Sequence, residues 1–143
     1  MAKRPKSKSL TLLGRSETAV PAAPSAIILE TFPNPAIRPY WIRFKSADFT
    51  SLCPVTGQAD FARITIDYRP AKRCVETKSL KFYLASYRNE RAFNEAVTNH
   101  ILDDLVRVCT PREMIVTAEF ASRGGISLTI TVAHPDESNR APR

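Results

Sequence analysis

The chain has few of the residues that build several common kinds of site. Its 143 residues include only four glycines, and none of them forms a G-x-G-x-x-G or Walker-type phosphate loop. Two histidines and three cysteines, with no C-x-x-C pair, give no clustered zinc-ligand pattern and no disulfide framework. No apolar run approaches the ~18 residues of a membrane-spanning helix. A nucleotide cofactor would therefore have to be held by something other than a glycine-rich loop.

The N-terminus is basic but lacks the apolar segment that follows the charged residues of a secretory signal. Together with the sparse cysteines, this favours a reducing, cytoplasmic location. The formal net charge is +7, and four of the basic residues behind it are Lys3, Arg4, Lys6 and Lys8. Such a run is usually a solvated arm, so we expect neither a membrane nor a nucleic acid as a direct partner.

The composition predicts one domain between two polar ends. Hydrophobic residues make up 43% and charged residues 24% of the chain, close to ordinary globular values. Residues 1–26, rich in Lys, Ser, Ala and Pro, predict a flexible basic leader. Residues 27–134 are expected to form the domain, and residues 135–143 a polar tail. A chain of this length can bury a sizeable core.

Hydrophobic periodicity predicts four strands and two helices. Alternating apolar residues indicate strands over 38–45, 63–68, 114–120 and 126–132. One helix is expected to begin with Thr77 as its N-cap. The second is expected to follow Asn89 as its N-cap and to carry an apolar stripe of Phe93, Val97, Ile101, Leu105 and Val108.

The connections between these elements predict the architecture. Residues 46–58 are expected to form a long loop between the first two strands, and Gly124-Gly125 a hairpin turn. The order β-β-α-α-β-β indicates an α+β domain, with an antiparallel sheet and two helices on one face. Its two exposed sheet edges favour assembly with further copies.

Cys53 and Asp60 are the candidate reactive side chains of the predicted loop. Pro54 fixes the backbone beside the Cys53 thiol, and an exposed thiol of lowered pKa can act as a nucleophile. The commoner role of an isolated cysteine is a small buried apolar residue, which Cys74 and Cys109 fit. Asp60 could exchange protons with a ligand held by the cysteine, or make a local turn bond at the start of a strand.

Charged residues on the predicted helices suggest binding roles. Lys78 and Lys81 share a face away from the apolar stripe of the first helix, where two cations can hold a phosphate, though such a face is more often only solvated. Glu95, beside Asn94 in the second helix, lies off the apolar stripe. A carboxylate can accept from two adjacent N–H donors such as those of a guanine edge, and otherwise is a solvated surface acid.

Two long motifs resemble a known family. Residues 49–61, Phe-Thr-Ser-Leu-Cys-Pro-Val-Thr-Gly-Gln-Ala-Asp-Phe, are similar to the nucleophile loop of the NADPH-dependent 7-cyano-7-deazaguanine reductases, the nitrile reductases of queuosine biosynthesis. Residues 75–83, Val-Glu-Thr-Lys-Ser-Leu-Lys-Phe-Tyr, resemble the family's E-[S/T]-K-S-x-K signature, and residues 123–127, Arg-Gly-Gly-Ile-Ser, also recur in it. The resemblance runs from about residue 11 to residue 134, and the length is that of the short, single-module class.

The resemblance implies the tunnelling fold, which is shared with GTP cyclohydrolase I and the pterin synthases. The unit of this fold is the β-β-α-α-β-β domain. Members assemble through their sheet edges into barrel-like rings, and the reductases of this class resemble stacked pentamers. We therefore expect a homo-oligomer whose active sites form between subunits.

The resemblance also implies a role for each candidate residue. Cys53 adds to the nitrile carbon of the 7-deazapurine substrate to give a covalent thioimide, and Asp60 donates protons during reduction by NADPH to the aminomethyl product. NADPH is implied to contact Lys78, Lys81 and, more weakly, Arg123, and no metal is implied. The residues implied to bind the substrate are Val75, Glu76, Thr77, Asn94 and Glu95.

The chain departs from the family pattern at two positions. Asn94 stands where many relatives have His, so it can form hydrogen bonds but cannot carry a proton. Ala59 stands where Pro is frequent, which loosens the loop slightly.

Two other functions compete with the reductase. A zinc-dependent tunnelling-fold enzyme acting on GTP or a pterin is disfavoured by the scarcity of histidine. A non-catalytic basic RNA-binding module is supported only by the N-terminal lysine run.

Overall fold

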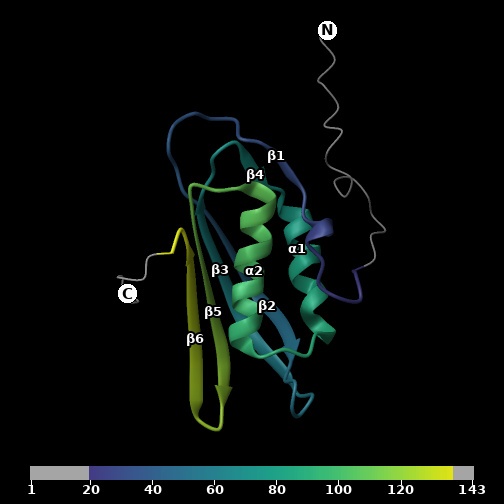
Figure 1. Ribbon diagram of the computed structural model, residues 1–143. Helices are drawn as coiled ribbons and strands as arrows, with labels where there is room; N and C mark the ends of the chain where they lie inside the picture. Colours follow the sequence, from purple (N-terminus) through teal and green to yellow (C-terminus); the bar gives the residue numbers. More distant parts are fainter. Residues whose placement is uncertain (1–19, 137–143) are drawn as a thin grey trace.

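Four long strands form an antiparallel sheet in the order β2-β3-β5-β6 (Figure 1). The computed structural model describes residues 20–136. The strands of this sheet are β2 (Ile42–Leu52), β3 (Ala59–Arg69), β5 (Glu113–Arg123) and β6 (Ile126–His134). A separate short antiparallel pair consists of β1 (Thr31–Pro33) and β4 (Arg73–Val75).

Two helices, α1 (Thr77–Ala85) and α2 (Asn94–Cys109), cover one face of the sheet (Figure 1). Two short 3-10 turns, η1 (Ala26–Ile28) and η2 (Ser86–Asn89), complete the described elements. Apart from the short β1–β4 pair, the order is β-β-α-α-β-β, so the predicted α+β architecture is confirmed. Neither helix has the length and continuous apolar surface needed to span a bilayer, and the described residues contain no other helix that does.

The core lies between the helices and the inner face of the sheet. Alternate residues of the strands and one stripe of each helix turn toward it, as the periodicity predicted. The residues that are at most 1% exposed include Ile64, Ile66, Tyr68, Met114, Val116 and Ala118 on the strands, and Tyr83, Val97, Ile101 and Leu105 on the helices.

The first two long strands extend further than the sequence predicted. The expectation of a loop over residues 46–58 is wrong, because β2 continues to Leu52 and only residues 53–58 form the turn. A bulge between Ser46 and Phe49 interrupts the register. The polar residues of this stretch resemble turn residues, but they lie on an edge strand, where one side of the backbone ladder suffices to fix the strand. At its other end the strand begins at Ile42, four residues later than expected.

The N-cap of the first helix lies one residue earlier than predicted. Glu76, not Thr77, is the N-cap, and its carboxylate oxygens accept the N–H groups of Lys78 at 2.8 Å and Ser79 at 2.7 Å. Two free amides at a helix start attract an anionic side chain, so the carboxylate outcompetes the hydroxyl of Thr77.

The second helix begins later than predicted. Asn89 ends η2 instead of capping α2, and residues 90–92 run extended beside β2. Leu52 N–H donates to the Glu90 carbonyl at 2.9 Å, and Ala92 N–H donates to the Leu52 carbonyl at 3.2 Å. Phe93 therefore precedes the helix and is 62% exposed, which corrects its placement on the apolar stripe.

The hairpin between β5 and β6 turns at Gly124-Gly125, as predicted. Both glycines have positive φ, at 57° and 79°, which is the backbone of a two-residue type I′ turn. Residues with a Cβ are strained in that conformation. Most of the predicted leader (residues 1–19) and of the predicted tail (residues 137–143) lies outside the described residues, so the domain boundaries stay predictions.

A buried polar network joins the two helices to the sheet. The Tyr83 hydroxyl donates to Asp104 Oδ2 at 2.6 Å and lies 2.8 Å from the Tyr87 hydroxyl, which lies 3.0 Å from His100 Nδ1. Burial raises the pKa of both tyrosines, so they act as neutral hydrogen-bonding groups. The ring of Tyr87 packs on Phe49 of β2 at a centroid distance of 5.5 Å. The network thus fixes the helices against β2, close to its C-terminal end.

Asp104→Ala is expected to lower the free energy of unfolding by about 1–3 kcal/mol, because it leaves the buried Tyr83 hydroxyl without its acceptor carboxylate. Asp103→Ala removes an exposed carboxylate from the same helix and should change that free energy by less than about 0.5 kcal/mol. Urea unfolding measures both values. Equal stabilities for the two variants would contradict the role given to the network.

Candidate active site

Cys53 begins the turn of residues 53–58 that joins β2 to β3. Two backbone bonds close this turn: Cys53 N–H donates to the Gln58 carbonyl at 2.8 Å, and Gly57 N–H donates to the Cys53 carbonyl at 2.9 Å. Gly57 has a φ of +71°, and a Cβ at this position would lie 3.0 Å from the guanidinium of Arg91. The backbone conformation therefore requires glycine here, and a Cβ would also displace the Arg91 guanidinium slightly.

The turn stabilises the ionised form of the Cys53 thiol. A hydrogen bond from the Thr56 side chain, followed by the backbone N–H groups of Thr56 and Val55, lowers the pKa of Cys53 to about 7. Desolvation opposes this change, and Arg123 adds to it. About half of such thiols are ionised at pH 7, so Cys53 carries the thiolate that a nucleophile needs.

The other two cysteines have the structural role expected of them. Cys74 and Cys109 are 2% and 1% exposed, whereas Cys53 is partly accessible. Burial raises the pKa of Cys109 to about 12. Among the described cysteines, Cys53 is thus the partly accessible one whose thiol has a lowered pKa.

Asp60 lies beside the turn, on the inner face of β3. It pairs in register with Ser51 of β2 and is 7% exposed. Arg123, the last residue of β5, places Nη1 3.3 Å from Asp60 Oδ1, and its Nη2 donates to Gln58 Oε1 at 2.6 Å. The guanidinium therefore connects Asp60 to the turn that carries Cys53.

A cavity of about 410 Å³ opens at this position between β3 and β5. Its lining includes Asp60, Gln58 and Arg123, together with the exposed ring of Phe61. A ligand in this cavity would contact the acid directly.

Asn94 and Glu95 lie at the same end of the molecule as Cys53. They form the first turn of α2, immediately after the extended residues 90–92 that pair with Leu52. Glu95 is exposed. Within residues 20–136, two buried side-chain oxygens have no hydrogen-bond partner, Asn94 Oδ1 and Ser51 Oγ. Both are acceptors available to a ligand.

The other predicted substrate residues lie at the opposite end of the sheet (Figure 1). Val75 N–H donates to the Tyr68 hydroxyl at 2.9 Å, and Tyr68 and Asp60 occupy opposite ends of β3. That separation is roughly 26 Å at a rise of ~3.3 Å per residue. Thr77 is the first residue of α1, and the carboxylate of Glu76 caps that helix. One chain therefore does not bring residues 75–77 to Cys53.

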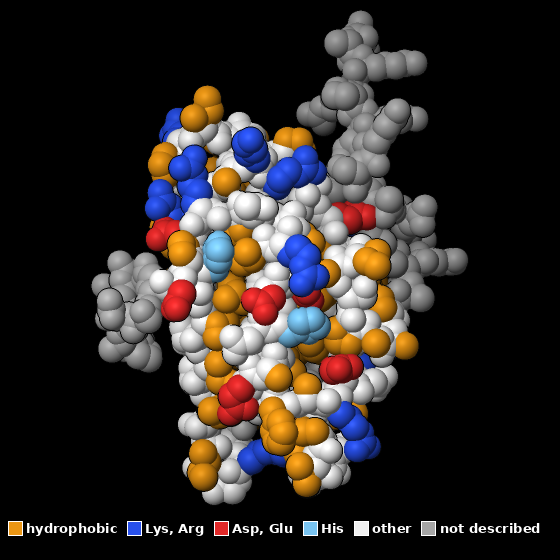
Figure 2. Space-filling model, viewed as in Figure 1, with side chains coloured by type: hydrophobic (Ala, Val, Ile, Leu, Met, Phe, Trp, Pro, Cys, Tyr) orange, Lys and Arg blue, Asp and Glu red, His pale blue; other side chains and the backbone are white. Residues whose placement is uncertain are grey.

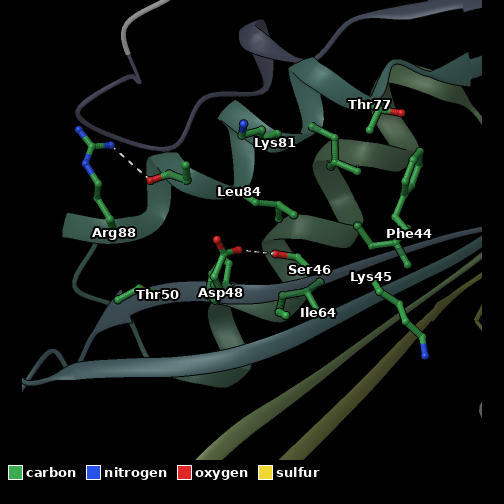
Figure 3. A pocket seen from close by; sticks show the side chains of 15 residues that line it. Phe44, Lys45, Ser46, Asp48, Thr50, Ile64, Thr77, Lys81, Leu84 and Arg88 are labelled. Carbon is green, nitrogen blue, oxygen red and sulfur yellow. Dashed lines mark hydrogen bonds between the residues drawn. The ribbon is translucent and has the colours of Figure 1, made fainter.

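A larger cavity of about 580 Å³ lies between α1 and the edge strand β2 (Figure 3). Its walls are mainly apolar, with Phe44, Leu84 and Ile64 among them, and Lys81 and Arg88 stand over it from the helical side, as Figure 3 shows. Lys78 is not among its lining residues. The volume lies within the range of small-molecule and cofactor sites.

Charge is mixed on the face that the helices cover. Figure 2 shows Lys and Arg gathered mainly at the upper end, with Asp and Glu spread over the middle. This face therefore lacks the continuous basic stripe expected of an RNA-binding module. Among residues 20–136, no three His, Cys, Asp or Glu side chains gather in an arrangement that could hold a metal ion.

Sequence reasoning missed three residues that shape the site: Thr56, Gln58 and Arg91. The first two fall inside the quoted motif, but their contacts depend on the closure of the turn. Arg91 reaches Gly57 only because residues 90–92 lie alongside β2. Arg123 was expected at the cofactor alone, and the fold places it beside Asp60 and the Cys53 turn.

Comparison with known proteins places these features in one family. Residues 59–139 match the family model described as QueF-like protein. The chain is 57% identical over 107 residues to the NADPH-dependent 7-cyano-7-deazaguanine reductase of Alkalilimnicola ehrlichii, covering 74% of this chain and 83% of that protein. The reductase of the same name from Nitrosococcus oceani is 53% identical over 116 residues, covering 80% of this chain and 90% of that protein.

The fold also has a counterpart among solved structures. The apo form of the archaeosine synthase QueF-Like superposes with a TM-score of 0.63 at 20% sequence identity, covering 67% of this chain and 94% of that one. This likeness supports the tunnelling fold, and the sequence matches identify the family. The chain belongs to the NADPH-dependent 7-cyano-7-deazaguanine reductase family.

Proposed function

We propose that this protein reduces the nitrile of 7-cyano-7-deazaguanine to a primary amine, with NADPH as reductant, in queuosine biosynthesis. The observation that carries the proposal is the Cys53 thiol, whose pKa is lowered to about 7 within a turn that also approaches Asp60 through Arg123. A nitrile carbon is electrophilic, and a thiolate adds to it readily near neutral pH. The names of the relatives supply the substrate and the reductant.

The first step joins Cys53 to the substrate. Its Sγ forms a bond to the nitrile carbon, one π bond of the nitrile breaks, and the nitrogen takes a proton from Asp60, which gives a thioimide. NADPH, when bound, supplies one hydride for the thioimide carbon and a second for the imine that follows. Between the two reductions the C–S bond breaks and the sulfur leaves as the Cys53 thiolate. Thioimide formation and each reduction add one proton to nitrogen, and one of these protons is lost from nitrogen when the C–S bond breaks to give the neutral imine, so the amine keeps two. Asp60 is the acid and base that we assign to these transfers.

The deazapurine ring of the substrate is held at the Cys53 end of the chain by Asn94 and Glu95. The exposed carboxylate of Glu95 can accept from two adjacent N–H groups of the purine edge. Asn94 Oδ1, which is buried without a partner, offers a further acceptor. As an amide, Asn94 orients the base but transfers no proton.

The residues of the α1 cavity fit an anionic dinucleotide. Lys81 and Arg88 stand over a mainly apolar cavity of about 580 Å³, so the cations would hold phosphate groups and the walls would contact flat rings. Lys78, one turn earlier on α1, would contribute a further charge near the same phosphates. Arg123, which lies beside Asp60, would contact the end of the cofactor that approaches Cys53.

We further propose that the complete site forms between two copies of the chain. Residues 75–77 lie too far from Cys53 in one chain to share a ligand with it, and both β2 and β6 are free edges of the sheet. Pairing of those edges into a ring would bring residues 75–77 of one subunit toward Cys53 of the next. The partly accessible free thiol also suits a reducing compartment, the cytoplasm.

The purified protein should oxidise two NADPH for each nitrile that it converts to the amine. Cys53→Ala should abolish this reaction. Asp60→Asn should lower kcat by about 10²–10⁴-fold, because it removes the proton donor and leaves the thiol. The exposed Asp103→Asn, which lies outside both cavities, serves as the matched control and should retain normal turnover. Absorbance at 340 nm and mass spectrometry of the product measure these effects, and normal turnover by Cys53→Ala would overturn the mechanism.

Two inactive variants should complement each other if the site is shared. Co-expression of Cys53→Ala with Glu76→Gln should restore about one quarter of the wild-type activity, since random assembly gives that fraction of sites both native residues. Glu76→Gln keeps an amide oxygen that can cap α1. Cys53→Ala with Asp60→Asn is the control and should stay inactive, because both changes lie in the same half of the site. No recovery by the first pair would contradict a site built from two chains.

A further inference from the structure

Arg88, at the rim of the α1 cavity, is fixed through one nitrogen of its guanidinium. Its Nη1 donates to the Pro21 carbonyl at 2.8 Å and to the Ala85 carbonyl at 3.3 Å. Neither Nε nor Nη2 has a hydrogen-bond partner among residues 20–136. These two nitrogens form the fork that binds a pair of anionic oxygens, and Arg43 binds Asp67 through the same pair of nitrogens. Arg88 is therefore held in place with its fork free for a phosphate.

The helical wall of the cavity carries positive charge that no carboxylate balances. The charged residues that line the cavity are Lys45, Asp48, Lys81 and Arg88. Figure 3 shows the side chain of Lys45 leading away from the cavity, and Asp48 on the strand side, across from the two helical cations. The ion pairs formed within residues 20–136 involve neither Lys81 nor Arg88. An anionic ligand is therefore attracted to the helical wall.

Lys81 and Arg88 match two separate anionic groups of one ligand. Arg88 follows Lys81 by seven positions, which is a rise of roughly 10–12 Å along α1 and η2. Figure 3 shows that their charged ends do not converge. A dinucleotide such as NADPH carries two such groups, the pyrophosphate and the 2′-phosphate on the adenosine ribose. NADH lacks the second of these groups.

The proposed shared site decides which end of the dinucleotide lies near Arg88. In that site residues 75–77 approach the reacting nitrile, so the nicotinamide that delivers the hydride lies at the start of α1. The adenosine then lies toward η2, where Arg88 is located. The apolar walls of the cavity, with Phe44 and Leu84, suit the adenine ring.

We propose that Arg88 binds the 2′-phosphate of NADPH and thereby selects NADPH over NADH. The assignment rests on the proposed function for the identity of the cofactor and for its direction in the cavity. Lys81, closer to the start of α1, takes the pyrophosphate. A phosphate monoester carries a charge of about −1.5 to −2 at pH 7, and the fork of Arg88 can bind two of its oxygens. The 2′-hydroxyl of NADH offers no charge to the same fork.

Equilibrium binding to the full chain tests the assignment without the reaction. Adenosine 2′,5′-bisphosphate and adenosine 5′-monophosphate differ only in the 2′-phosphate, and calorimetry gives both dissociation constants. The wild type should bind the bisphosphate at least about tenfold more tightly. Arg88→Gln removes the charge and should reduce this ratio to about threefold or less. Arg88→Lys keeps the charge without the fork and should give an intermediate ratio.

Arg63→Gln is the matched control for these measurements. It removes an exposed guanidinium on β3 that lines neither cavity, and it should keep the wild-type ratio. Equal affinities of the wild type for the two nucleotides, or an unchanged ratio in Arg88→Gln, would overturn the assignment. Binding requires neither the nitrile nor turnover, so this result keeps its meaning if the proposed reduction fails.

Steady-state kinetics separates the roles of the two cations. Arg88→Gln should raise the KM for NADPH at least about tenfold, and it should leave kcat and the kcat/KM for NADH within about twofold of wild type. Lys81→Gln should lower kcat/KM for both cofactors by a similar factor, because both carry the pyrophosphate. A loss for NADH as large as that for NADPH in Arg88→Gln would overturn the assignment to the 2′-phosphate.

Discussion

The pairing of β2 with β3 up to the turn of residues 53–58 is the constraint on which the site depends. Ser51 lies opposite Asp60 in this ladder, so the two strands bring the acid to the base of the turn that presents Cys53. The backbone bond between Cys53 and Gln58 then closes the turn, and its amides and the Thr56 side chain lower the pKa of the Cys53 thiol. A slip of one residue in this register would turn Asp60 to the opposite face and separate acid from nucleophile.

The elements packed around this turn stabilise it from two sides. Residues 90–92 lie alongside Leu52, which places Arg91 against Gly57 and starts α2 beside the site. From the sheet, Arg123 reaches both Asp60 and Gln58 at the point where β5 ends. The buried Tyr83–Asp104 network fixes α1 and α2, the helices that lie before and after residues 90–92 in the chain. Cys53 and Asp60 are therefore brought to the same turn within one chain, whereas residues 75–77 lie at the far end of the sheet, and we propose that a second copy brings them to the site.

The sequence predicted the elements whose apolar pattern is strong. The alternation of Ile64, Ile66 and Tyr68 identified β3, and the stripe of Val97, Ile101 and Leu105 identified α2, because burial alone decides these patterns. The edge strand β2 was partly mistaken for a loop, since its polar residues carry no such pattern. The caps of both helices were misplaced because they depend on competition between neighbours, such as Glu76 with Thr77. Cys53, Asp60 and Glu95 came from motif resemblance, whereas the contacts of Thr56 and Arg123 arise only when the turn closes beside β5.

The formation of a covalent bond between Cys53 and the nitrile tests this account most directly. The protein is mixed with 7-cyano-7-deazaguanine without NADPH, and its intact mass and peptide masses are measured. The account predicts that each chain gains the mass of one substrate molecule, that the modified peptide contains Cys53, and that Cys53→Ala gains none. A wild-type chain that reduces the nitrile but shows no such adduct, or that carries it on another residue, would contradict the account.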